Sequence, residues 1–375
     1  MTQPRFLQIH TLHSYTAALL NRDDTGQAKR LRYGGSQRIR ISSQCLKRHW
    51  RMAQDDPHAL QGLAGYEASF RSRELVTEKV IAPLRGRFPD EVVKALEPAF
   101  QKLVYGDKAD KGKKSRQTLL LGQPELDWLA ARAEEIARSA GDAKEAEKAA
   151  ADWAKDKNFK AMSNSAALPG GLAAALFGRM ITSDPAANID APVYVAHAFT
   201  VHGAEADGDY FTAVDDLRKD EDDGGADTIQ ETELTSGLYY GYVVVDLPGL
   251  IANCGSDRDL AARVVHNLVH LIAEISPGAK LGSTAPFGRA DLMLVEAGDR
   301  QPRSLATAYR CAIAHDVDEA RAAMQEELRG FDDAYATGEA RAHLCRGGAL
   351  DGIEKLALKP LAEWAAACVK DAPDA

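Results

Sequence analysis

The fold is organised around the sequence NRDDTGQAKRLRYGGSQRIRISSQCLKRHWRM at residues 21–52. This stretch contains nine lysine and arginine residues against two acids, Asp23 and Asp24. Residues 1–51 carry a net charge of +8 and the remaining chain −17, within a protein whose net charge is −9. A basic block confined to one part of an acidic chain predicts a local binding site for a polyanion.

The overall composition is that of a globular protein with a sizeable core, at 45% hydrophobic and 27% charged residues. No apolar run approaches the roughly 18–20 residues that cross a bilayer, and the N-terminus lacks the apolar core of a signal peptide. The five cysteines are scattered without a CxxC pair, which is typical of reduced thiols. We therefore expect a cytoplasmic protein with no membrane partner, no cofactor and no bound metal.

Inside the basic stretch, residues 37–41 alternate strictly between polar and apolar side chains. Arg38 and Arg40 share one face, and Ile39 and Ile41 share the other. A period of two is the pattern of a half-buried strand. The two arginines are candidates for polyanion contact, or they brace the preceding loop through its acids.

A helix is predicted over residues 43–52, with Ser42 and Ser43 supplying an N-cap. At about 100° per residue, Leu46 and Trp50 lie together and face the core. A basic arc of roughly 100° occupies another side of this helix, at Gln44, Lys47, Arg48 and Arg51. Free amides and the helix dipole add to these side chains, which favours phosphate binding over a merely solvated face.

The rest of the chain supplies the other elements of one sheet. Without its long insertions, the predicted order is strand, helix, strand, strand, helix, strand, at residues 5–12, 43–52, 192–202, 236–247, 257–275 and 290–297. This is the ferredoxin-like βαββαβ pattern, which RNA-recognition modules also use. The two middle strands bracket a polar excursion too long for a tight hairpin, which indicates a projecting arm.

Three features invite a catalytic or metal-binding interpretation. His266 and His270 are spaced i, i+4, but Asn267 stands where a zinc-protease helix has glutamate, so a polar helix edge is favoured. The acidic run at 215–227 lacks the DxDxDG pattern of a calcium loop, and a solvated tip is favoured. Asp23 and Asp24 would either hold a metal near bound RNA or shape the loop by pairing with Arg22 or Lys29.

The motifs that carry a family resemblance follow one another in chain order. The block LNRDDTGQAKR…YGGSQRIRISSQCLKRHWR precedes HAFTVH, DYFTAVDD, TSGLYYGY, and PGAK with DLMLV. Together they resemble the CasC family, the repeated backbone subunits of the type I-E CRISPR surveillance complex Cascade. The resemblance runs from Phe6 to about Val295, and residues 54–165 and 300–375 carry little of it.

The resemblance implies an α+β fold built on an RRM-like, ferredoxin-like palm. The palm would comprise residues 1–53 with 186–202 and 236–300. A large helical fingers insertion would span 54–185, and a projecting thumb hairpin would span 203–235. Residues 301–375 would form a C-terminal helical segment that completes the palm.

The same resemblance implies an antiviral function without catalysis. Copies of the subunit would form a helical filament along CRISPR RNA, bind its phosphates, and present the spacer for pairing with target DNA, together with other Cascade subunits. Related subunits of type III complexes cut target RNA with a loop aspartate, so a metal-dependent RNase using Asp23 or Asp24 is the alternative. A stand-alone RNA chaperone is a weaker third hypothesis.

The resemblance also implies which residues contact RNA. Guide-backbone contacts would come from Asn21, Arg22, Lys29, Ser42, Gln44, Lys47, Arg48 and Arg51. Residues beside a kinked nucleotide at the thumb would be Met180, Phe211, Thr212 and Ile229. Cations and a capped helix bind phosphates without sequence preference, and apolar side chains can open a base stack.

Overall fold

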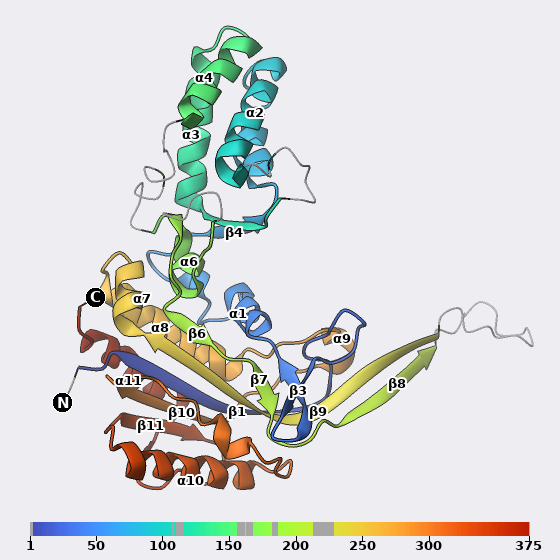
Figure 1. Cartoon of the computed structure of the whole chain (residues 1–375), viewed down its shortest axis with the longest axis vertical. Helices are drawn as coiled ribbons and strands as arrows, with labels where there is room; N and C mark the ends of the chain where they lie inside the picture. The colour runs from blue at the N-terminus through green and yellow to red at the C-terminus, as the bar shows by residue number, and fades with distance from the viewer. Residues whose placement is uncertain are drawn as a thin grey trace, which may run out of the picture. The chain divides into compact units, whose positions relative to one another are not determined.

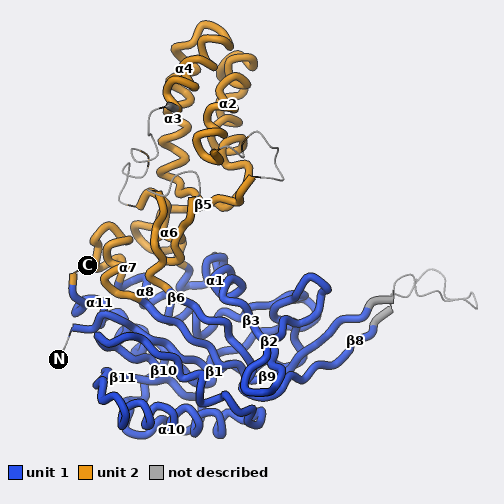
Figure 2. Tube along the Cα trace, in the orientation of Figure 1, with its two compact units in different colours: residues 1–59, 194–245, 262–373 blue, residues 60–193, 246–261, 374–375 orange. Residues whose placement is uncertain are grey.

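The computed structural model describes residues 3–106, 109, 116–155, 162, 168–181, 187–212 and 229–374. The chain divides into two compact units, which Figure 2 colours separately. The first comprises residues 1–59, 194–245 and 262–373, and the second comprises residues 60–193, 246–261 and 374–375. Residues 246–261, expected in the palm, therefore group with the insertion.

A large sheet forms the centre of the first unit. Its strands, within the described residues, are β1 (Phe6–Ala18), β2 (Arg30–Tyr33), β3 (Ser36–Ile41), β6 (Val193–Val195), β7 (Ala198–Thr200), β8 (Ala206–Thr212), β9 (Ile229–Asp246), β10 (Ala290–Gly298), β11 (Ala340–Cys345) and β12 (Glu354–Lys355). The order across the sheet is β12-β11-β10-β1-β9-β7-β3-β2, and β6 and β8 pair with β9. The expected strand at 5–12 is the first part of a central strand that pairs antiparallel with β10.

Helices cover both faces of this sheet (Figure 1). The described helices are α1 (Ser43–Met52), α8 (Arg258–Glu274), α9 (Leu281–Thr284), the short η6 (Ala306–Tyr309), α10 (Val317–Tyr335) and α11 (Leu358–Lys370). Neighbouring residues Tyr239 and Tyr240 of β9 point to opposite faces. Tyr240 packs in a core cluster with Met324 of α10, and Tyr239 packs in another with Leu46 of α1.

Two predictions of local structure are wrong. Residues 30–33, for which no strand was predicted, form β2, which pairs antiparallel with β3 as a hairpin. Residues 301–375 are not simply helical, because β11 adds to the sheet beside β10. Its sequence ARAHLC does not resemble that of a covered strand, because it contains Arg341. The guanidinium of Arg341 is accommodated there by ion pairs with Glu296 (2.7 Å) and Asp332 (2.6 Å).

An arm of two strands extends from the first unit, formed by β8 and the beginning of β9 (Figure 1). Their antiparallel register runs from Ala206 opposite Thr235 to Thr212 opposite Ile229. The acidic run at 215–227, expected near the tip, lies outside the described residues.

The second unit is mainly helical. Its elements include β4 (Ser69–Ser72), β5 (Leu119–Gly122), α2 (Asp90–Tyr105), α3 (Gln123–Ser139), α4 (Ala143–Lys155), α6 (Gly171–Phe177), α7 (Leu247–Asn253), and the short η1 (Leu60–Gly62), η2 (Val76–Ile81) and η3 (Ala82–Leu84). Its core contains Phe100, Leu129 and Trp153, contributed by α2, α3 and α4. The chain as a whole is of the α+β class. None of the helices in the described ranges has the length and apolarity that crossing a bilayer requires.

Candidate nucleic-acid interface

Helix α1 presents its basic side chains because its apolar side is anchored in the core. It begins at Ser43, and the Ser42 hydroxyl accepts a hydrogen bond of 3.3 Å from the Cys45 amide, so the predicted cap and helix bounds are confirmed. Trp50 is only 3% exposed, and Leu46 packs on the neighbouring cluster. The predicted inward pair is thereby confirmed.

The predicted arc of α1 lies on its more accessible side. Gln44 and Arg48 are exposed, while Lys47 and Arg51 are half-buried. Burial lowers the pKa of Lys47, and both half-buried cations make further contacts within the chain. Arg48 is therefore the cation of α1 that is most accessible to a ligand.

The loop before β2 is shaped by Asp23. Its carboxylate Oδ1 accepts hydrogen bonds from the Thr25 amide (2.9 Å), the Thr25 hydroxyl (2.7 Å) and the Gln27 amide (3.0 Å). These bonds, led by the one from the Thr25 hydroxyl, lower the pKa of Asp23. Asp23 thus shapes the loop through Thr25 and Gln27 and not through the expected ion pairs with Arg22 or Lys29, while Asp24 is exposed.

Two anchors hold this loop in place. Asn21 Oδ1 accepts a hydrogen bond of 2.9 Å from the Ser42 amide, which joins the loop to the start of α1. On the other side, Glu233 of β9 accepts a hydrogen bond from the Ala28 amide at 2.6 Å and forms an ion pair with Arg30. Asn21 and Ser42 therefore position the interface, and Ser42 itself is buried.

Several cations converge on the start of α1. Burial raises the pKa of the Cys45 thiol, while the charges of Lys29 and Arg48 lower it, so both cations lie near this thiol. Arg22, Lys29 and Arg48 form no ion pair with any carboxylate in the described part of the chain. Their charge is therefore available to an external anion.

His197, which matches no motif in the sequence, lies at the start of α1 beside Arg40. Its Nδ1 accepts a hydrogen bond of 3.1 Å from the Ser43 amide and lies 3.4 Å from Nη1 of Arg40. Burial, followed by the charges of Arg40 and Lys29, lowers the pKa of His197. The sequence feature that could have identified His197 is its position as a polar residue inside the apolar run VYVAHAF. At this position the expected strand 192–202 divides into β6 and β7.

These contacts change one part of the expected phosphate site. Two amides at the start of α1 are already paired, that of Ser43 with His197 and that of Cys45 with Ser42. The attraction for an anion therefore comes from the side-chain cations and the helix dipole more than from unpaired amides.

Arg38 does not lie at this surface, although it was predicted to share an exposed face with Arg40. It is 0% exposed, and its guanidinium donates to the carbonyls of Thr200 (2.9 Å), His202 (3.2 Å) and Tyr309 (3.0 Å). The half-buried strand prediction fails here because the chain around η6 covers β3 on that face. Arg40 remains half-exposed and donates from Nε to the carbonyl of Arg30 at 3.2 Å.

The glycine turn of the β2–β3 hairpin explains how this covering is possible. Gly34 has a positive φ of 58°, and a Cβ at this position would lie 1.4 Å from the carbonyl oxygen of Arg310. Only glycine allows this close approach of the two backbones. The hairpin can therefore pack under the segment that buries Arg38.

A family profile decides the relationship to known proteins. The profile described as CT1975-like protein matches residues 7–365, which is nearly the whole chain. The chain belongs to this family. No sequence among the curated proteins matches it.

Solved structures agree with this assignment of a CT1975-like protein. A chain of a structure titled "CRISPR RNA-guided surveillance complex, pre-nicking" is 26% identical, with a TM-score of 0.78, covering 97% of this chain and 100% of that one. A second, titled "CRISPR RNA-guided surveillance complex", is 21% identical with a TM-score of 0.61, covering 96% and 98%, and shows the shared fold. The resemblance to Cascade backbone subunits is confirmed.

The arm of this CT1975-like protein carries three of the predicted contacts. The backbones of Phe211, Thr212 and Ile229 belong to the β8–β9 ladder, in which Thr212 is opposite Ile229. Their side chains lie outside the described residues. Met180 belongs to the second unit, where it is 69% exposed. A role beside a kinked nucleotide stays a prediction for all four.

At its root, the arm forms a groove of about 470 Å³ with the loop 21–28. Arg22 and Lys280 line the groove together with Asp207, Glu231 and Glu233. Since these carboxylates repel phosphates, an RNA backbone is better accommodated on the α1 side of the loop.

Among the described residues, the side chains that are arranged as metal ligands lie outside the loop that contains Asp23 and Asp24. The group that could hold a metal is His58, His270 and Glu274, and it includes neither Asp23 nor Asp24. The carboxylate of Asp23 is already engaged by Thr25 and Gln27. This arrangement argues against Asp23 as a ligand for a catalytic ion.

Proposed function

We propose that this chain is a non-catalytic backbone subunit of a Cascade-type complex that binds the phosphates of CRISPR RNA. The observation that carries the proposal is the convergence of Lys29, Arg40 and Arg48 at the capped start of α1, with His197 beside Arg40. Lys29 and Arg48 have no carboxylate partner among the described residues. Membership in the CT1975-like family supports the same conclusion.

The fold supports a division into palm, fingers and thumb. Strands β1, β6–β7, β9 and β10, with α1 and α8 between them, follow the βαββαβ order of an RRM-like palm. The second unit corresponds to the fingers, and the β8–β9 arm corresponds to the thumb. Assignment to type I-E and a cytoplasmic location belong to the proposal.

In this proposal, copies of the subunit stack along one guide RNA, and the thumb interrupts the guide at intervals. Met180, Phe211, Thr212 and Ile229 lie beside the displaced nucleotide. The spacer between the thumbs pairs with target DNA, and other Cascade subunits complete the complex. The relative titled as an RNA-guided surveillance complex supports these partners.

The decisive experiment measures how RNA affinity depends on salt. Each phosphate contact with single-stranded RNA contributes about 0.7 to the slope of log K against log salt. Replacing Lys29, Arg40 and Arg48 with alanine removes the three cations that converge at the start of α1, none of which has a carboxylate partner among the described residues. We expect the slope to fall by about 2 and the filament on guide RNA to weaken.

A matched control removes three exposed cations from other elements of the first unit, with Arg300→Ala, Arg329→Ala and Lys359→Ala. This variant changes the net charge equally and should keep the slope. An unchanged slope in the first triple variant, with the control indistinguishable from it, would refute phosphate binding at α1.

The nuclease alternative predicts a different result. Assembled protein would cut complementary RNA in magnesium at regular spacing, and Asp24→Ala would abolish the cuts. We expect no cleavage, because Asp23 is engaged within its own loop. Regular magnesium-dependent cuts by the native chain would overturn the assignment as non-catalytic.

A further inference from the structure

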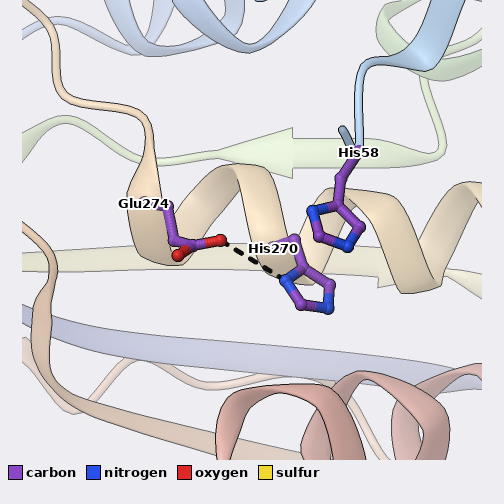
Figure 3. Close-up of side chains that lie close together, drawn as sticks. All are labelled: His58, His270 and Glu274. Atoms are coloured by element: carbon purple, nitrogen blue, oxygen red, sulfur yellow. Dashed lines mark hydrogen bonds and ion pairs between the residues drawn. The ribbon is translucent and has the colours of Figure 1, made fainter. Parts of the chain in front are cut away.

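His58 lies beside His270 and Glu274 of α8 (Figure 3). His266, His270 and Glu274 follow one another at intervals of four residues on this helix. His58 reaches them from the segment that follows α1, and all four residues belong to the first unit. Neither the family relationship nor the proposed RNA contacts give this cluster a role.

We propose that His58, His270 and Glu274 bind a transition-metal ion of the Zn²⁺ type. One ligand atom from each residue lies within 4.8 Å of the others. Two nitrogen ligands and one carboxylate are a donor set that zinc accepts, with a fourth position left for water. This inference does not depend on the proposed binding of RNA.

The two ligands on α8 already have the separation that a metal requires. Nδ1 of His270 lies 3.4 Å from Oε2 of Glu274. In a tetrahedral site with bonds of about 2.0–2.2 Å, neighbouring ligand atoms lie roughly 3.4 Å apart. The same distance is long for a hydrogen bond. The pair therefore fits a metal better than it fits a direct contact.

The environment of His270 points the same way. Its side chain is only 7% exposed. Buried polar groups are normally hydrogen-bonded, and Nδ1 of this imidazole, the atom that would face the ion, has only the long 3.4 Å contact with Glu274.

His58 is the ligand that must adjust. Its ring stacks on that of His270, with 3.5 Å between centroids and planes 4° apart, so the two rings do not yet direct their lone pairs at one point. The His58 side chain is 28% exposed on a short segment and can turn out of the stack. Glu274 is held in place, since its Oε1 lies 3.2 Å from Nη2 of Arg289. A bound ion would therefore tie the segment after α1 to α8.

The test uses the full chain, stripped of metal by a chelator and titrated with Zn²⁺ against a chromogenic competitor at pH 7.5. We expect one ion per chain at this site, and no comparable binding of Mg²⁺, which prefers oxygen ligands. His58→Ala and Glu274→Gln change partly accessible side chains and should fold, and each should weaken binding by at least about tenfold.

His315→Ala serves as the matched control, since it removes a histidine outside the cluster, and it should retain the affinity. Substitution by Co²⁺ reports the ligands independently through its visible spectrum. Zinc affinity that is the same in the native chain, His58→Ala and Glu274→Gln would overturn the proposal. So would a thiolate charge-transfer band with Co²⁺, which would assign the binding to cysteine.

Discussion

Asn21 Oδ1 accepts a hydrogen bond of 2.9 Å from the backbone amide of Ser42, a residue 21 positions further along the chain. This contact joins the basic loop to the start of α1, so that Lys29 and Arg48 lie near the same thiol of Cys45. One of the two anchors of the loop is therefore a neutral amide side chain, so this contact occupies neither Lys29 nor Arg48.

Replacing Asn21 tests this contact. Asn21→Ala leaves the Ser42 amide without its acceptor, which should cost about 1 kcal/mol of stability. RNA affinity should fall by up to about tenfold because the cations are no longer held together, yet the salt slope should not change because no charge is removed. Fluorescence titrations at several salt concentrations measure both quantities.

Asn21→Asp is the matched control for that variant. Aspartate keeps an acceptor for the Ser42 amide, so stability should be retained, while its negative charge should weaken RNA binding. If Asn21→Ala bound RNA as tightly as the native chain, the loop would not need this anchor.

The cap of α1 gives a second prediction. Ser42→Ala removes the acceptor for the Cys45 amide and should destabilise the first unit by about 1 kcal/mol. Denaturant unfolding measures this loss. Ser43→Ala should have little effect, because Ser43 contacts His197 through its backbone amide. Equal losses in the two variants would contradict the assignment of Ser42 as the cap.

The position of His197 among cations leads us to predict that RNA binding depends on pH. Its pKa in the folded protein lies below 6.5, mainly through burial and then through Arg40 and Lys29. The stability that it contributes is thus present above pH 6.5 and is lost as the pH falls through the lower, folded value. A bound phosphate would favour the charged ring and raise this pKa.

RNA affinity should therefore rise as the pH is lowered from 7.5 towards 6, with uptake of a proton on binding. His197→Gln keeps a hydrogen-bond acceptor but cannot titrate, and it should abolish this pH dependence. His315→Gln changes a histidine elsewhere in the first unit and should preserve it. A pH dependence that survives in His197→Gln would have another origin.

The ionisation of Glu296 leads us to predict that the stability of the first unit falls in acid. Burial by itself raises the pKa of this carboxyl, but hydrogen bonds from Arg303 and His10 outweigh burial and hold the pKa well below its usual range. Its contribution to stability is therefore present above the unfolded value of about 4.3 and is lost as the pH falls below it.

Glu296→Gln should cost roughly 3–5 kcal/mol at pH 7, because it leaves the guanidinium groups of Arg303 and Arg341 without their shared partner. Urea unfolding at pH 7 and at pH 3 measures the loss, which should shrink at the lower pH. Glu326→Gln, at an exposed position of α10, should be nearly neutral at both.

The local elements around the basic stretch could be predicted because their signals are local. The cap at Ser42, the helix over residues 43–52 and the inward position of Trp50 each follow from residues within one or two turns. The strand at 290–297 is likewise observed as β10, since residues 292–295 form a continuous apolar run. Such patterns need no knowledge of distant parts of the chain.

Other predictions failed where distant segments decide the outcome. Arg38 alternates with Ile39 as a surface residue would, yet carbonyls of Thr200 and Tyr309 surround its guanidinium. Strand β11 was missed because Arg341 looks like a surface residue until Glu296 is placed beside it. His197 showed no motif, because its partners come from β3 and α1.

The basic stretch, the capped helix and the family of this chain can be recognised from residues that are neighbours in the chain, because charge and periodicity are local properties. Which cations remain available depends on the folded chain, in which Arg38 is buried and Lys29 and Arg48 lie near Cys45. The tertiary structure also decided that His58 meets His270 and Glu274, more than 200 residues away. The physical reason is that burial and pairing of a charge depend on which distant backbone and side-chain groups the fold brings beside it.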